Sequence, residues 1–214
     1  MSRKSIIKCI FALTIAQILS VLVHLFIDGR MPVIGESLSR YVGKAWWSSI
    51  FLAVGDFFTA YQLVRYSREI NSVHKMPKIW WVCGAGLIAG LIGLSLCPLG
   101  LFDADPINNP GLVSNCHEFC SRLMFVSMIS VILGIAIIFG RKSKITLAAC
   151  LAYLVYGCFF VGGHLANLEI YNSIFFVWEN IFLYGFFFTL LTVPCAVEKK
   201  VEVKTSTAKE EAKD

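Results

Sequence analysis

Six apolar runs, each about 20 residues long, constrain this chain more than any other feature of its sequence. A helix of about 20 apolar residues crosses the hydrocarbon core of a bilayer, and in lipid the backbone must satisfy its own hydrogen bonds. The runs lack the alternation of apolar and polar residues that marks barrel strands. The sequence therefore predicts an all-α, polytopic membrane protein with six transmembrane helices in one bundle. The predicted spans are 6–27, 45–65, 79–97, 119–140, 145–165 and 174–195.

The composition separates the chain from soluble and nucleic-acid-binding proteins. Hydrophobic residues make up 57% and charged residues 15% of its 214 residues, whereas soluble domains carry about 25% charged residues. The net charge is +5, but the basic residues stand in short flanks between apolar runs. There they act as topology signals and not as a phosphate-binding face. We therefore expect membrane lipids as partners and no nucleic acid.

The positions of lysine and arginine predict how the chain is oriented. With both termini cytoplasmic, the inner segments hold 15 of the 19 Lys and Arg residues and the outer loops hold 3. The positive-inside rule favours that arrangement. We expect one transmembrane domain, 1–195, followed by a polar, disordered cytoplasmic tail, 196–214. The loops 98–118 and 166–173 then face outward.

Seven ionisable residues lie in or beside the predicted spans, and six of them fall in the outer half. Because ionisable groups are costly in lipid, we expect them to face protein or a water-filled cavity. We predict a polar pocket that opens outward, with Asp56 near the midplane as its floor. Arg122 would meet a lipid phosphate, and Glu118 and Glu179 would hold Arg122 in place. The candidate ligand-binding residues are His24, Asp56, His117, Glu118, Arg122, His164 and Glu179.

Structural roles are the alternatives for these residues. Glu118 and Arg122 are spaced i, i+4 and could simply neutralise each other at a helix end. Histidines near a water interface are more often hydrogen-bonded caps or anchors than catalysts. Asp56 could pair with Gln62 or with a tyrosine and lock the bundle.

Cysteine and glycine spacing predicts two further contacts. Cys97 and Cys116 flank the outer loop and could form a disulfide if that loop is extracytoplasmic. Gly86 and Gly90 have GxxxG spacing, which predicts a close helix contact, either within the chain or in a homo-oligomer. The sequence contains no recognised catalytic or phosphate-binding motif. We expect neither a metal nor a cofactor, and catalysis is not the favoured function.

One loop and the last span resemble those of the Frag/DRAM/Sfk family of multi-pass membrane proteins, or of related bacterial families of unknown function. The resemblance rests on six spans with both ends cytoplasmic, on residues 98–102 (PLGLF) with His117, and on residues 178–182 (WENIF). The chain departs from the family pattern where Glu118 and Phe119 replace a small Gly-Ala pair. The resemblance implies a non-enzymatic protein linked to lipid handling. Its membrane would be a eukaryotic Golgi, lysosomal or plasma membrane, or a bacterial inner membrane.

We therefore expect a non-enzymatic integral membrane protein that binds or handles a lipid through the outer pocket. Two other functions stay open at this point. One is an intramembrane lipid-remodelling enzyme that uses His117, His164 and a carboxylate. The other is a proton-coupled transporter that uses Asp56 and Glu179. A scaffold whose polar residues only pair with one another is the remaining alternative.

Overall fold

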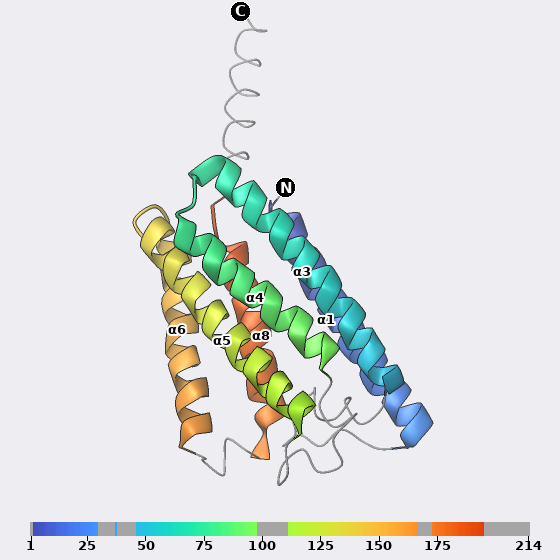
Figure 1. The fold of residues 1–214 in the computed structure, drawn as a ribbon. Coiled ribbons are helices and arrows are strands. Elements are labelled where there is room, and N and C mark those ends of the chain that lie inside the picture. The colour runs from blue at the N-terminus through green and yellow to red at the C-terminus, as the bar shows by residue number, and fades with distance from the viewer. Residues whose placement is uncertain (1, 30–36, 38–45, 98–110, 167–172, 195–214) are drawn as a thin grey trace, which may run out of the picture.

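The computed structural model describes residues 2–29, 37, 46–97, 111–166 and 173–194, which form six α-helices and no strand. Successive helices run in opposite directions, so that α1 begins and α8 ends at the same end of the bundle (Figure 1). The all-α prediction is confirmed for this part of the chain. The helices are α1 (Ser2–Asp28), α3 (Trp46–His74), α4 (Lys78–Leu96), α5 (Leu112–Phe139), α6 (Lys144–Leu165) and α8 (Phe175–Leu191).

The helices form a closed ring in which most neighbours in sequence are also neighbours in space. α1 packs along α3, α3 along α4, α4 along α5, and α5 along α6. α8 completes the ring, because it contacts both α6 and α1, and it also reaches α5. The short connections between α3 and α4 (75–77) and between α5 and α6 (140–143) favour antiparallel neighbours at those two places.

Four of the helices are long and apolar enough to cross a membrane: Arg3–Ile27, Lys78–Leu96, Leu112–Phe139 and Lys144–Gly163. α8 is apolar but has only 17 residues, which is near the lower limit for a span. α3 is long, but polar residues such as Asp56 and Gln62 interrupt its apolar stretch. Four spans thus support a membrane protein, and the full count of six stays a prediction.

Large apolar side chains cover the outside of the bundle. Phe11 on α1, Val126 and Ile137 on α5, and Val155 on α6 are all exposed. A water-facing surface of this kind would drive aggregation. Lipid chains solvate such a surface, so the exposed apolar residues support a membrane location.

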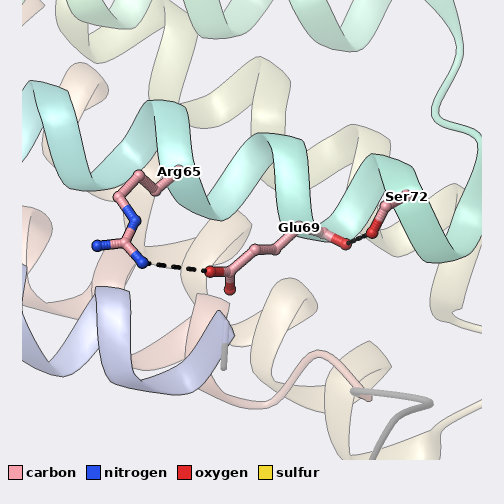
Figure 2. A network of polar contacts seen from close by, with 3 residues as sticks. All are labelled: Arg65, Glu69 and Ser72. Carbon is pink, nitrogen blue, oxygen red and sulfur yellow. Dashed lines mark hydrogen bonds and ion pairs between the residues drawn. The ribbon is translucent and has the colours of Figure 1, made fainter.

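Several helix boundaries differ from the predicted ones, most of all the end of α3. The polar segment 66–78 separates the predicted spans 45–65 and 79–97, which implies a loop, but α3 continues through it as far as His74. Tyr66 and Ile70, one turn apart on this helix, are both buried against the bundle. Arg65 and Glu69 form an i, i+4 ion pair at 3.9 Å, and the Ser72 hydroxyl donates to the Glu69 backbone carbonyl (Figure 2). A buried apolar face therefore keeps this polar segment helical beyond the end of the predicted span at residue 65.

α5 begins at Leu112, so the last residues of the predicted loop 98–118 form its first two turns. α8 ends at Leu191, earlier than the predicted end of the span at residue 195. Pro194 accounts for that early end, because proline disfavours the helical conformation in the residue before it. The predicted tail, 196–214, lies outside the described residues.

Basic residues distinguish the two ends of the bundle. We call the end where α1 begins and α8 ends the basic end, and the opposite end the far end. All described lysines and arginines except Arg122 lie toward the basic end. These are Arg3, Lys4, Lys8, Arg65, Arg68, Lys75, Lys78, Arg141, Lys142 and Lys144.

The glycine face of α4 contacts α5 of the same chain. A Cβ atom on Gly90 would lie 2.8 Å from the Met124 Cβ and 2.9 Å from the backbone of Met124 and Cys120. A Cβ on Gly86 would lie 2.5 Å from the Ser127 hydroxyl oxygen. The two helices therefore approach more closely than any side chain on this face would allow, as GxxxG spacing predicts.

Aromatic rings join α5, α6 and α8. The Phe182 ring of α8 lies 5.3 Å from Phe125 of α5, and 4.8 Å from Phe160 and 5.0 Å from Tyr153 of α6, between ring centroids. These separations are typical of attractive ring pairs. This aromatic cluster fixes α8 against its neighbours, and α8 carries part of the site described next.

Candidate functional site

A cavity of about 100 Å³ lies between five helices in the far half of the bundle. Its size is sufficient for several water molecules or a small polar group. Its polar lining comes from α1, α3, α4, α5 and α8, and leucines supply much of the remainder. The polar lining residues are Gln17, Ser49, Asp56, Ser95, His117, Glu179 and Asn180.

Asp56 stands on α3 and faces α4 across the cavity. The Ser95 hydroxyl lies 3.1 Å from the Asp56 Oδ2 and donates a hydrogen bond to it. Ser95 is the last residue but one of α4, so the Asp56 carboxylate is level with the far end of that span. Counted along the predicted span 45–65, Asp56 falls near the midplane, and this depth stays a prediction. Relative to α4, the residue lies near the end of the helix, because α3 extends beyond α4 there.

His117 lies in the second turn of α5 and is 7% exposed. Its Nδ1 is 2.7 Å from the backbone carbonyl oxygen of Cys97. A carbonyl oxygen only accepts, so Nδ1 carries the hydrogen, and in a neutral ring Nε2 is then the acceptor nitrogen. This bond fixes the ring at the cavity wall and holds the end of α4 against the start of α5.

α8 contributes Glu179 and Asn180 to the cavity. The Asn180 amide donates to the Phe176 carbonyl at 2.8 Å, which leaves its side-chain oxygen as an acceptor. Gln17 of α1 is held from α8 as well, because the Tyr184 hydroxyl donates to its Oε1 at 2.9 Å. Contacts between α1 and α8 therefore set the position of the polar groups on that side.

The structure brings three of the seven predicted residues together, since Asp56, His117 and Glu179 line one cavity. Glu118 and Arg122 do not join them. Their side chains are 57% and 72% exposed, and they form an ion pair with each other on the surface of α5. The alternative in which these two residues neutralise each other thus describes the observed contact.

The other two predicted residues lie apart from the cavity lining. His24 is buried on α1, 1% exposed, and is not among the lining residues. His164 lies in the last turn of α6, and its side chain falls outside the described part of the chain. Within the described ranges, no cluster of three or more His, Cys, Asp or Glu side chains is arranged to hold a metal ion.

Four lining residues were not predicted as site residues: Gln17, Ser49, Ser95 and Asn180. All four are neutral, so a search for ionisable residues passes over them. The sequence does mark these positions: each is a polar residue inside an apolar run or directly beside a predicted site residue. A neutral polar side chain in a span also prefers the protein interior, which makes such positions candidates for a cavity wall.

Three cysteine residues gather where α4 ends and α5 begins. Cys97, Cys116 and Cys120 are all free thiols in the structure, and Cys97 is hydrogen-bonded to Cys116. Burial raises the pKa of the Cys97 thiol above its ordinary value of 9.0, and the two neighbouring cysteines raise it further. The predicted Cys97–Cys116 disulfide therefore has its partners in contact, although the structure holds them reduced.

We expect a mild disulfide oxidant to link Cys97 to Cys116. Because the thiolate is the attacking form and the Cys97 pKa is raised, the rate should be low near pH 7 and increase through pH 9. Peptide mapping without reductant would detect the link, and Cys116→Ser is the control. Recovery of Cys97 entirely as a free thiol at pH 9 would contradict this expectation.

Comparison with known proteins adds no relative: no family model, no curated protein and no solved structure matches this chain. A function is therefore inferred from the geometry of the cavity alone.

Proposed function

We propose that this chain is an integral membrane protein that binds a lipid through the far-end cavity, without catalysing a reaction on it. The observation that carries the proposal is that Asp56, His117 and Glu179, from three different helices, line one cavity. Polar groups at membrane depth are costly unless they serve a ligand or one another. Their convergence on an open space favours a ligand.

The depth of the cavity suits a lipid headgroup. Asp56 is bonded to Ser95 at the far end of α4, which is where a span of this length meets the headgroup region. The basic residues lie at the other end, so the positive-inside rule assigns the cavity to the outer leaflet. A transporter would favour a carboxylate at mid-depth, and the level of Asp56 fits it less well.

The lining also suits an amphipathic ligand. Leucines on four helices, Leu13, Leu52, Leu91, Leu94 and Leu183, stand beside the polar groups. Such a mixture matches the general character of ligand pockets, which are mainly apolar with a few directed polar groups. The resemblance to the Frag/DRAM/Sfk family implies lipid handling too, and agrees with this proposal.

The proposal is tested by filling the cavity. Ala53 lines it, so Ala53→Phe should occupy its space, whereas Ala152→Phe adds the same ring to an exposed position on α6. Native mass spectrometry of the purified protein should show lipid retained by the wild type and by Ala152→Phe. The lipid should be lost from Ala53→Phe. Equal retention by both variants, each folded by circular dichroism, would refute lipid binding at this cavity.

A further inference from the structure

The packing of α4 on α5 selects which of the three clustered cysteines can be linked. Cys120 lies against Gly93, because a Cβ on Gly93 would meet the Cys120 sulfur. One helical turn nearer the far end, Cys97 at the end of α4 is hydrogen-bonded to Cys116. Cys116 and Cys120 are spaced i, i+4, which separates Cβ atoms by about 5–6 Å, whereas a disulfide needs about 3.5–4.5 Å. Cys97 and Cys116 are therefore the pair that can form a disulfide.

This cysteine pair adjoins the polar wall of the cavity. His117 follows Cys116 in the chain, and its Nδ1 donates to the Cys97 carbonyl oxygen at 2.7 Å. Ser95 stands two residues before Cys97, and its hydroxyl donates to the Asp56 carboxylate at 3.1 Å. Both His117 and Ser95 line the cavity. A change in the bond between the two cysteines is therefore transmitted directly to the cavity lining.

We infer that Cys97 and Cys116 form a reversible disulfide that controls how firmly the cavity holds its lipid. The inference rests on the proposed function and names the regulation of the same site. In the reduced protein, noncovalent contacts hold the end of α4 against the start of α5 at this point. A covalent link restricts the movement of Ser95 and His117, so less conformational freedom is lost when a ligand binds. The oxidised form is the one that binds lipid more tightly.

The oxidant is a small-molecule disulfide, RSSR, such as oxidised glutathione. The thiolate of one cysteine attacks RSSR, forms a mixed disulfide and releases one RSH. The thiolate of the other cysteine then attacks the protein sulfur of the mixed disulfide and releases the second RSH. The two protein thiols lose two electrons and two protons, which convert RSSR to two RSH. By the positive-inside rule the far end faces outward, where compartments are oxidising enough for disulfides to form.

The test compares lipid retention by the oxidised and the reduced protein. Oxidised glutathione and dithiothreitol prepare the two forms, and peptide mapping establishes whether the link is present. Each form is incubated in detergent with equal amounts of phosphatidylethanolamine and phosphatidylglycerol, and native mass spectrometry measures the lipid retained. We expect the oxidised wild type to retain about threefold to tenfold more lipid, as the avoided ordering of about one side chain implies.

Three variants assign the effect to the cysteine pair and to the cavity. Cys116→Ser removes the pair, so its lipid retention should be the same after either treatment. Cys120→Ser is the matched control, because it removes a cysteine one turn away on α5 and leaves the pair intact. It should respond to oxidation as the wild type does. Ala53→Phe fills the cavity and should retain no lipid in either form.

Each outcome decides a different part of the proposal. Equal retention by the oxidised and reduced wild type, with the link present, would overturn the redox inference and leave lipid binding in place. A redox response that persists in Cys116→Ser would overturn it as well. If neither form retains lipid, the proposed function fails, and amide hydrogen exchange tests the link by itself. The link should slow exchange about threefold or more in the last turn of α4 and the first two turns of α5. Unchanged exchange there would overturn the coupling between the disulfide and the cavity wall.

Discussion

Replacing Gly90 by alanine should destabilise the bundle by roughly 3 kcal/mol and lower its Tm by several degrees. The added Cβ would lie 2.9 Å from the Cys120 carbonyl oxygen and from the Met124 Cα. Both are backbone atoms, so no side chain can rotate away, and α4 must separate from α5. Thermal unfolding of the detergent-purified protein measures the loss.

Gly84 provides the matched control for this prediction. It lies on the same helix, and a Cβ placed there meets no atom within 4 Å. Gly84→Ala should therefore leave stability unchanged or improve it by up to about 1 kcal/mol through helix propensity. Equal losses from the two substitutions would show that α4 and α5 are not in close contact.

Gly86 offers a graded version of the same experiment. The atom nearest to its added Cβ is the Ser127 hydroxyl oxygen, at 2.5 Å, and the Ser127 Cβ is 3.7 Å away. Removing the hydroxyl in a Gly86→Ala, Ser127→Ala double variant should recover most of the stability that Gly86→Ala loses. No such partner exists for Gly90, because its obstacles include the backbone.

The second large effect is expected at Phe182, at the centre of the aromatic cluster. The residue is 0% exposed and its ring contacts both α5 and α6. Phe182→Ala should reduce stability by about 3–5 kcal/mol, because it leaves a cavity where three helices meet. In a membrane this loss comes mainly from van der Waals contacts, since lipid chains are as apolar as the protein interior.

Phe188, on the same helix, is the control for Phe182. Its side chain is 57% exposed and faces outward. Phe188→Ala should therefore remove few contacts within the protein and leave the stability of the bundle almost unchanged. The two variants are compared by their Tm and by the fraction of protein that stays folded in detergent. A loss at Phe188 as large as that at Phe182 would contradict the packing described here.

The sequence predicted the helices well because hydropathy and length determine them. It could not predict which side of each helix faces the cavity. His117 and Met124, seven residues apart on α5, share a face of the helix and both line the cavity. Arg122 is five residues from His117, which turns it by about 140° around the helix axis. Its exposure follows from that angle, but only after the neighbours of α5 are known.

The continuation of α3 escaped prediction for a similar reason. Residues 66–74 are polar enough to suggest a loop, and only the tertiary packing of Tyr66 and Ile70 shows a buried face. The level of Asp56 relative to α4 also depends on tertiary packing, because it is set by where α4 ends beside α3. Local sequence patterns thus predicted where the helices are. How far each helix is shifted along its neighbours could be known only from the assembled bundle.

The short last helix has a consequence for the surrounding bilayer. α8 has 17 residues, which span about 25 Å, several ångströms less than a typical hydrocarbon core. Val177, Ile181 and Phe188 form an exposed apolar stripe along it, which is suited to contact with lipid chains. As the sixth predicted span, α8 would require a membrane to thin locally to match that stripe, at a modest cost for each ångström of mismatch. In a cell with membranes of unequal thickness, this mismatch would sort the protein toward the thinner ones.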